Sequence, residues 1–152
     1  MADTSYLKSI VEDHVRGWLK EKFGRTFAPA FLSLAGVQGK ARTHEFDAVS
    51  EDRTIVCSIK TASWKTSGGK RGSGKVHGAY TELYFLGLVA ARDKYLVLTD
   101  PEFFRCFTRE TGGRLINGVT LLHCPLPDDL CREINSIRTK SRSELGFEDP
   151  IP

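Results

Sequence analysis

The sequence predicts an α/β fold in which helices flank a mixed β-sheet. Two segments near the middle of the chain read as strands: 44–50 (HEFDAVS) alternates along its length as a half-buried strand does, and in 54–61 (TIVCSIKT) Val56, Ser58 and Lys60 share one face. Residues 5–23 instead carry apolar side chains at helical spacing, and 76–91 (VHGAYTELYFLGLVAA) form a run too long and too apolar for a strand. Helical and extended patterns that succeed each other in this way favour an α/β sandwich around a mixed sheet.

The first half of the chain predicts one helix and three strands. The helix over 5–23 stops at Gly24, because glycine readily takes the left-handed conformation that ends helices. Residues 27–37 are β-prone around 31–34 and contain Pro29, so they predict a first strand at the edge of the sheet. The turn-like residues 51–53 then join the strands 44–50 and 54–61 into a hairpin.

The second half predicts a buried helix over 76–91 followed by two strand and helix pairs. Residues 94–99 (KYLVLT) read as a short buried strand, and Asp100 followed by Pro101 predicts the start of a helix that runs to about Glu110. A further strand is expected over 119–124. A last helix after 127–129 places Leu130, Ile134 and Ile137 on one face.

Length and composition are those of an ordinary globular protein. The chain has 152 residues, of which 40% are hydrophobic and 27% charged, so we expect a single domain over 1–145 and a flexible tail over 146–152. The four cysteines form no CxxC pair and are expected to be reduced thiols. No apolar run approaches the roughly 18 to 20 residues that span a membrane, and the first residues lack a signal-peptide core, which predicts a cytoplasmic protein without a membrane partner.

Three residues, Asp47, Lys60 and Glu82, are candidates for a catalytic site. Alternation places Glu45, Asp47 and Val49 on one side of their strand, with Phe46 and Ala48 on the other. On the next strand Val56, Ser58 and Lys60 share a face, and the hairpin brings Asp47 beside Lys60.

Glu82 is the third of these residues, because it is a carboxylate on the apolar face of the predicted helix. Its neighbours three and four positions away are Gly78, Ala79, Phe85 and Leu86. Burying an unpaired carboxylate costs several kcal/mol, so a cation or a hydrogen-bond donor is expected nearby. A metal ion is one such cation. A partner arginine or lysine, or a position at the edge of the helix, is the alternative.

This order of elements, with Asp47 on the second strand and Lys60 at the end of the third, resembles the PD-(D/E)XK nuclease superfamily. The resemblance covers roughly 7–98 and implies the restriction-endonuclease-like αβββαβ core, here followed by a C-terminal strand and helix. It implies that Asp47 and a second acid hold Mg²⁺, with Mn²⁺ able to substitute, and that Lys60 orients or activates the attacking water.

The triplet departs from the family pattern, because Ser58 stands where the second acid is expected and is a poor ligand for Mg²⁺. A subset of restriction endonucleases carries serine at this place and supplies the acid from the following helix. Similarity to that subset implies that Glu82 is the second metal ligand. The glycine-rich segment 65–75 lengthens the interval between Lys60 and Glu82, so the register of Glu82 is inferred and not matched.

Two further acids are candidates for the same site. Glu12 on the first helix resembles a recurrent family position that touches the metal site through water, which makes it a fourth catalytic candidate. A solvated surface position is the alternative, because Glu12 lies near the edge of the apolar stripe. Glu45 is an alternative ligand whose favoured role is that of a polar strand residue.

A basic loop follows the third strand. Between Thr61 and Thr81 there is no acid, and four cations lie there among glycines and serines, with an aromatic residue at the near end: Lys65, Lys70, Arg71, Lys75 and Trp64. Such a loop suits the phosphate backbone of DNA, which gives affinity and salt dependence without reading sequence. Trp64 either stacks on a base or anchors the loop. The alternative for the loop is an exposed linker without a ligand.

The segment 69–75 (GKRGSGK) also fits G-x4-G-K, the start of a nucleotide-binding P-loop. Val76 stands where serine or threonine would hold Mg²⁺, and the segment follows the preceding strand only after some eight residues. A P-loop fold also needs a larger parallel sheet. The four histidines are scattered without zinc spacing, and His77 reads as a surface residue that could otherwise orient a phosphate or a water.

The function expected from the sequence is that of a Mg²⁺-dependent DNA endonuclease of restriction, repair or mobile-element type. The resemblance implies a homodimer as one assembly, since such nucleases often pair two sites to cut two strands. The alternatives are an inactive nuclease-fold module that binds nucleic acid or protein, motivated by Ser58, and a P-loop nucleotide binder.

Overall fold

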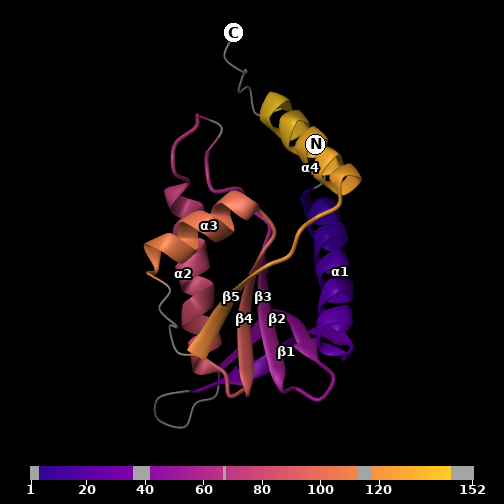
Figure 1. The fold of residues 1–152 in the computed structure, drawn as a ribbon, viewed down its shortest axis with the longest axis vertical. Helices are drawn as coiled ribbons and strands as arrows, with labels where there is room; N and C mark the ends of the chain where they lie inside the picture. The colour runs from indigo at the N-terminus through magenta and orange to yellow at the C-terminus, as the bar shows by residue number, and fades with distance from the viewer. Residues whose placement is uncertain (1–3, 36–41, 67, 113–117, 145–152) are drawn as a thin grey trace.

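The computed structural model describes residues 4–35, 42–66, 68–112 and 118–144, and side chains through residue 136. A five-stranded sheet lies between two pairs of helices (Figure 1). One face is covered by α1 (Thr4–Phe23), with α4 (Asp128–Glu144) packed near the start of α1, and the other by α2 (Ser73–Leu88) and α3 (Pro101–Glu110). The α/β class and the expected order of elements are confirmed. The expected tail over 146–152 lies outside the described residues.

The strands lie in the sheet in the order in which they occur along the chain. They are β1 (Phe27–Leu34), β2 (Arg42–Ser50), β3 (Ile55–Lys60), β4 (Asp93–Leu98) and β5 (Val119–His123). The first three are antiparallel neighbours, whereas β3, β4 and β5 run parallel. The connections β3–α2–β4 and β4–α3–β5 each join neighbouring parallel strands and advance across the sheet in the same direction. Because such crossovers are right-handed, both place their helix on the same face, and α2 and α3 therefore share one side of the sheet. The expected edge position of the first strand is confirmed.

The helix boundaries follow from the residues that the sequence singles out. Gly24 ends α1 with a φ of 69° and donates its N–H to Lys20 O. The Asp100 carboxylate accepts a hydrogen bond from Phe103 N, and Pro101 occupies the first position of α3. Both predicted helix ends are therefore confirmed with the expected geometry.

Each face of the sheet has its own hydrophobic core. The core under α2 and α3 includes the fully buried Phe46, Val56, Leu86 and Phe103. The core under α1 and α4 contains Val11, Val15, Leu19, Ala48, Ile55 and Val97, together with Leu130 and Ile134 from α4. The predicted contact face of the last helix is thus confirmed for the two residues whose side chains are described.

The four cysteines are free, as expected. Burial raises the pKa of the Cys57 thiol far above its usual value and raises the pKa of Cys124 to about 11, so both stay protonated and unreactive at neutral pH. None of the helices in the described part of the chain combines the length and the hydropathy that a bilayer crossing needs.

Candidate active site

A β-bulge in β2 determines where Asp47 points. Ala28 pairs with Val49 and Ala30 pairs with Phe46, so a single residue of β1 faces two residues of β2, Asp47 and Ala48. The expected strict alternation across the strand is therefore wrong here: Val49 lies in the same core as Phe46, and Ala48 in the opposite one. An extra residue resets the two-residue period, and bulges of this kind re-aim side chains beside functional sites.

The strands β2 and β3 part at the bulge. Their ladder contains the pairs Val49 with Val56 and Ala48 with Cys57. Beyond these pairs, the Ile59 backbone N–H donates a hydrogen bond of 2.8 Å to Asp47 Oδ2. In a continuous ladder the same N–H would bond to a backbone carbonyl of β2. Burial raises the pKa of Asp47 and the Glu82 charge raises it further, while the Ile59 bond opposes the shift. The hairpin thus brings Asp47 to the residue next to Lys60.

Glu82 reaches the same place from α2. The fully buried Ser58 donates a hydrogen bond of 2.9 Å from Oγ to Glu82 Oε2, and the charge of Glu82 acts on Asp47. In the described part of the chain, the polar partners of Glu82 are Ser58 and His44, and neither is an arginine or lysine. The Glu82 side chain is 24% exposed, which is compatible with the alternative of a position at the edge of the helix. Ser58 of β3 therefore fixes one oxygen of the Glu82 carboxylate from α2.

His44 is a residue of this site that the sequence analysis missed. Its ring stacks on Phe85 of α2, with centroids 4.0 Å apart, and Nε2 lies 3.7 Å from Glu82 Oε2. The sequence pattern that could have identified His44 is its two-residue spacing from Phe46, which places both side chains on the α2 side of β2. His77 is exposed, so its reading as a surface residue is confirmed.

Glu12 approaches Asp47 from α1, on the opposite face of the sheet. Only 9% of Glu12 is exposed, so its alternative reading as a solvated surface acid is wrong. Burial raises the pKa of Glu12 and the nearby Asp47 charge adds to the shift. Glu12 Oε1 is buried without a hydrogen bond, because Lys8 Nζ at 3.8 Å is too far to donate one.

Arg16 ties Glu12 to the bulge. Its Nη2 lies 3.3 Å from Glu12 Oε2, and its Nε donates a hydrogen bond of 2.9 Å to Asp47 O. One guanidinium therefore contacts both the side chain of the α1 acid and the bulged backbone of β2. The periodicity of α1 gave no sign of this role, because a bond from a helix to a strand backbone depends on tertiary packing.

Lys60 lies at the end of β3, against α2. A Cβ added at Gly78 would lie 3.0 Å from Lys60 Nζ, so the absence of a side chain at Gly78 makes room for the ammonium. Gly78 precedes Glu82 by one turn, and both therefore present the same face of α2. The predicted common face of Val56, Ser58 and Lys60 is confirmed, because Val56 and Ser58 also meet this side of the sheet.

The carboxylates of Glu12, Asp47 and Glu82 have the ligand chemistry that a divalent cation prefers, but they do not form a complete coordination site. Hard carboxylate oxygens suit Mg²⁺, and a cation would offset both the lack of a hydrogen bond to Glu12 Oε1 and the mutual repulsion of Asp47 and Glu82. Within the described residues, no three side chains of His, Cys, Asp or Glu lie close enough to hold a metal together. A metal here would depend on Asp47 and Glu82, with water filling most other positions.

The basic loop is attached to α3 by ion pairs, so two of its cations have acidic partners. Lys65 Nζ lies 3.6 Å from Glu102 Oε1, and Arg71 forms an ion pair with Glu110. Arg71 also lies over the Trp64 ring, which packs edge to face on Phe103. Trp64 therefore anchors the loop in this structure, in keeping with one of its two readings.

The two remaining loop lysines differ from each other. Lys70 is exposed, and among the described residues its ammonium has no hydrogen-bond or ion-pair partner. Lys75 Nζ donates hydrogen bonds of 3.1 and 3.2 Å to Ser63 Oγ and Lys65 O, within the loop itself. Its ammonium is thus directed back toward the end of β3.

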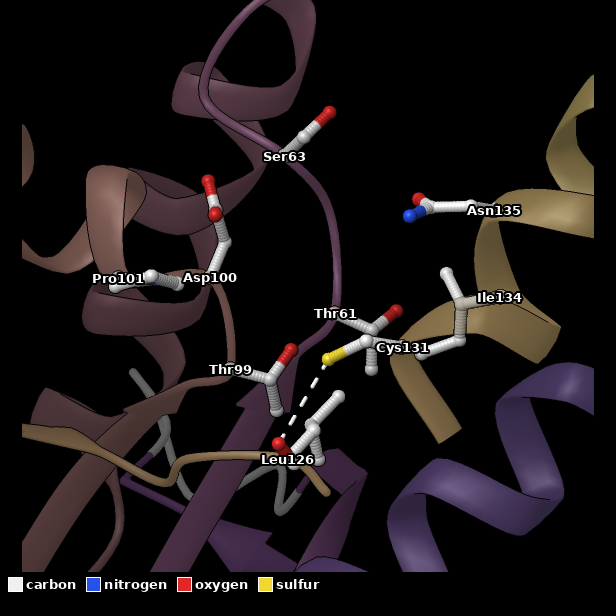
Figure 2. A pocket seen from close by; sticks show the side chains of 9 residues that line it. All are labelled: Thr61, Ser63, Thr99, Asp100, Pro101, Leu126, Cys131, Ile134 and Asn135. Atoms are coloured by element: carbon white, nitrogen blue, oxygen red, sulfur yellow. Dashed lines mark hydrogen bonds between the residues drawn. The ribbon is translucent and has the colours of Figure 1, made fainter. Parts of the chain in front are cut away.

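Two open depressions flank the segment 61–63. Figure 2 shows the first, in which Thr99 and Asp100 face Cys131 and Asn135 of α4 across the ends of the parallel strands. The Asp100 carboxylate also accepts a hydrogen bond from Trp64 N. The second depression lies between the start of α1, the segment 61–63 and Lys75. The two differ in charge, because an acid lines the first and two lysines line the second.

Comparison of this chain with protein-family models, with curated proteins and with solved structures gives no match.

Proposed function

We propose that the protein is a metal-dependent nuclease of the restriction-endonuclease-like fold that hydrolyses DNA phosphodiester bonds. The observation that carries this proposal is the hydrogen bond from Ser58 to Glu82, at a site where Glu82 also acts on Asp47. It supports the view that the acid missing from the triplet has moved to α2. The arrangement of a strand acid, a helix acid and a strand-end lysine supports the same reading.

Each residue has a distinct role in the proposed reaction. Mg²⁺ bound by Asp47 and Glu82 would supply Lewis-acid stabilisation of the charge that develops on the phosphate. Ser58 fixes the Glu82 carboxylate, and the Ile59 N–H fixes Asp47, so neither acid has to reorganise. The Lys60 ammonium lies beside α2, where it can orient the attacking water and steady the negative charge.

The test is nicking of supercoiled plasmid DNA in the presence of Mg²⁺ or Mn²⁺. Glu82→Gln and Lys60→Ala should lower the rate at least about 100-fold, the effect typical of removing a group that acts directly on the reaction. Ser58→Ala should have a smaller effect, because the carboxylate remains but loses its donor. Full activity in Glu82→Gln and Lys60→Ala would refute these assignments.

A matched control separates the site from general effects of charge. Glu45 lies on the same strand as Asp47 and is exposed, so Glu45→Gln should nick DNA at the rate of the unmodified protein. Equal losses in Glu45→Gln and Glu82→Gln would point to bulk electrostatics and not to a site.

One observation favours a second candidate function, a nuclease fold that binds nucleic acid without cutting it. Among the described side chains, no three ligand-type residues come close enough to bind a metal together. Salt-sensitive DNA binding that is independent of metal, with no nicking by the unmodified protein, would support this function over hydrolysis.

A further inference from the structure

The depression of Figure 2 lies outside the carboxyl ends of the parallel strands, where the chain leaves the sheet in two directions. The connections β3–α2 and β4–α3 lead to one face of the sheet, whereas the connection from β5 leads to α4, which packs with α1 on the other face (Figure 1). A crevice opens between strand ends whose connections diverge in this way. Open α/β sheets bind their ligands in such crevices.

The depression has a polar side and an apolar side. Thr99 and Asp100, where β4 passes into α3, face Leu126 and Ile134 from the connection to α4 and from α4 itself. Cys131 Sγ lies 3.7 Å from Leu126 O and joins these two segments. The volume is about 230 Å³, below the roughly 300 to 1,000 Å³ of most ligand pockets, so it suits a single ring system.

Thr99 supplies a buried hydroxyl that the protein does not use. The residue is only 5% exposed, and among the described residues its Oγ1 has no hydrogen-bond partner. Figure 2 shows this hydroxyl directed into the depression. Because a buried hydroxyl without a partner costs free energy, a ligand that bonded to it would recover that cost.

Asp100 supplies an acceptor on the same side. Its Oδ2 accepts both of its hydrogen bonds, from Trp64 N at 3.0 Å and from Phe103 N at 3.1 Å. Among the described residues, no donor bonds to Oδ1. The fold therefore fixes the carboxylate through one oxygen and leaves the other for a ligand that carries an N–H donor.

The depression is connected to the candidate active site through the sheet. Thr99 N donates a hydrogen bond of 3.2 Å to the backbone oxygen of Lys60, and Thr61, which follows Lys60, lines the depression. A nucleic-acid strand at the active site would therefore have bases within reach of this crevice.

We propose that the depression binds an unpaired nucleobase that carries an exocyclic amino group. The amino N–H donates to Asp100 Oδ1, as cytosine N4 does to aspartate, and the Thr99 hydroxyl bonds to the adjacent ring nitrogen, as donor or acceptor. Leu126 and Ile134 contact the ring. The choice of a nucleobase among amino-bearing ligands rests on the proposed nuclease function.

The experiment measures the anisotropy of fluorescein-labelled single strands in EDTA, where the proposed hydrolysis cannot proceed. Strands of deoxycytidine and of deoxyuridine, equal in length, differ at position 4, where an amino group is replaced by a carbonyl that would face the Asp100 oxygen. The unmodified protein should prefer the deoxycytidine strand at least about fivefold, the lower end of what one good base contact discriminates.

Asp100→Asn should invert this preference. Asparagine keeps an oxygen for Trp64 N and Phe103 N, and its amide nitrogen replaces Oδ1, so a donor then faces the base and favours deoxyuridine. The control Asp93→Asn changes an aspartate at the other end of β4 and should keep the preference of the unmodified protein. Equal weakening of both strands by Asp100→Asn would indicate structural damage and overturn the proposal.

Thr99→Val tests the hydroxyl with a side chain of the same shape. It should bind the deoxycytidine strand about fivefold more weakly, without a fall in Tm, because the hydroxyl has no partner in the described protein to lose. Unchanged binding, or a loss accompanied by a lower Tm, would remove Thr99 from the site.

Calorimetric titration with cytidine and uridine separates the two sources of the base. A preference for cytidine that Asp100→Asn inverts, with no preference between the strands, would assign the depression to a free nucleoside. A preference between the strands would assign it to a base of the bound strand. The absence of both preferences would overturn the proposal.

The outcomes also distinguish the base site from the proposed function. A protein whose nicking depends on Glu82 but which shows neither preference would be a nuclease without this base site. A preference that Asp100→Asn inverts, in a protein that never nicks DNA, would support the base site and refute the nuclease.

Discussion

Asp47 lies at the point where carboxylates from both faces of the sheet meet. Glu12 approaches from α1 and Glu82 from α2, and the charge of Asp47 couples to each. Burial and a neighbouring negative charge raise the pKa of Asp47 and of Glu12, and so destabilise their ionised states. Clustering of this kind is typical of functional sites, where stability is often lower than the fold alone would allow.

The first prediction concerns the pH dependence of stability. Folding raises the pKa of Asp47 above the usual value of an aspartate, because the carboxyl is buried, so the folded protein favours the protonated acid. That contribution to stability is complete below the unfolded pKa and is lost as the pH rises through the folded value. At pH 7 without divalent metal, Asp47→Asn should therefore raise the Tm, by roughly 2 to 4 °C for each kcal/mol of repulsion removed.

The sign of this effect is checked by thermal unfolding followed by circular dichroism between pH 4 and 8. Asparagine keeps an oxygen that can accept from Ile59 N–H, so the advantage of Asp47→Asn should shrink as the pH falls toward 4. The exposed Glu45→Gln should show no such trend. A lower Tm for Asp47→Asn at pH 7 would contradict the prediction.

At the scale of elements, most of this structure could be predicted from sequence, because the local patterns agree with the tertiary packing. The buried stripe of α1, the capped start of α3 and the apolar residues of the buried strand β3 each have one dominant physical cause. The bulge at Asp47 and Ala48 could not be predicted, since the extra residue appears only when β1 and β2 are aligned. The contact of Arg16 with the β2 backbone was hidden for the same reason.

The second prediction uses the packing of α2 against Lys60. Gly78→Ala should stabilise the helix by up to about 1 kcal/mol, because alanine is the better helix former. The new Cβ would lie 3.0 Å from Lys60 Nζ and should displace the ammonium, so DNA nicking should fall by about tenfold, the change in rate for 1.4 kcal/mol. Stability and activity should therefore move in opposite directions.

Gly17→Ala provides the matched control for this effect. Gly17 lies inside α1, and a Cβ added there meets no atom within 4 Å. It should raise the Tm without lowering the nicking rate. Loss of activity in Gly17→Ala, or full activity in Gly78→Ala with a raised Tm, would contradict the assigned position of Lys60.

The third prediction concerns the attachment of the basic loop to α3. Glu102→Gln/Glu110→Gln removes the partners of Lys65 and Arg71 and should leave the Tm nearly unchanged, since exposed ion pairs contribute about 0 to 1 kcal/mol each. The released cations should strengthen oligonucleotide binding several-fold at low salt. Glu21→Gln, an exposed change on α1, should strengthen it much less, and equal gains would show that net charge alone is responsible.

For the whole molecule, the arrangement of layers explains why the site forms where it does. The antiparallel half of the sheet meets the parallel half at β3, and the ladder between β2 and β3 opens on that side. Helices on both faces can then direct side chains into the opening, α1 with Glu12 and α2 with Glu82. The sequence indicated both acids, but it could not show that one serine hydroxyl holds Glu82 in place, since Ser58 and Glu82 are 24 residues apart.

The last prediction tests whether a divalent metal binds between β2, β3 and α2 and thereby stabilises the folded protein. A ligand that binds the folded state alone stabilises it by mass action, by about 2.7 kcal/mol at 100 times its Kd. Mg²⁺ or Mn²⁺ should therefore raise the Tm of the unmodified protein by several degrees, and EDTA should reverse the rise. Asp47→Asn and Glu82→Gln should abolish it, because each removes an anionic ligand, whereas the exposed Glu51→Gln should not. Differential scanning fluorimetry across a metal titration gives the measurement. An equal rise in Glu82→Gln would place the metal elsewhere, and the helix acid would then lose its proposed role.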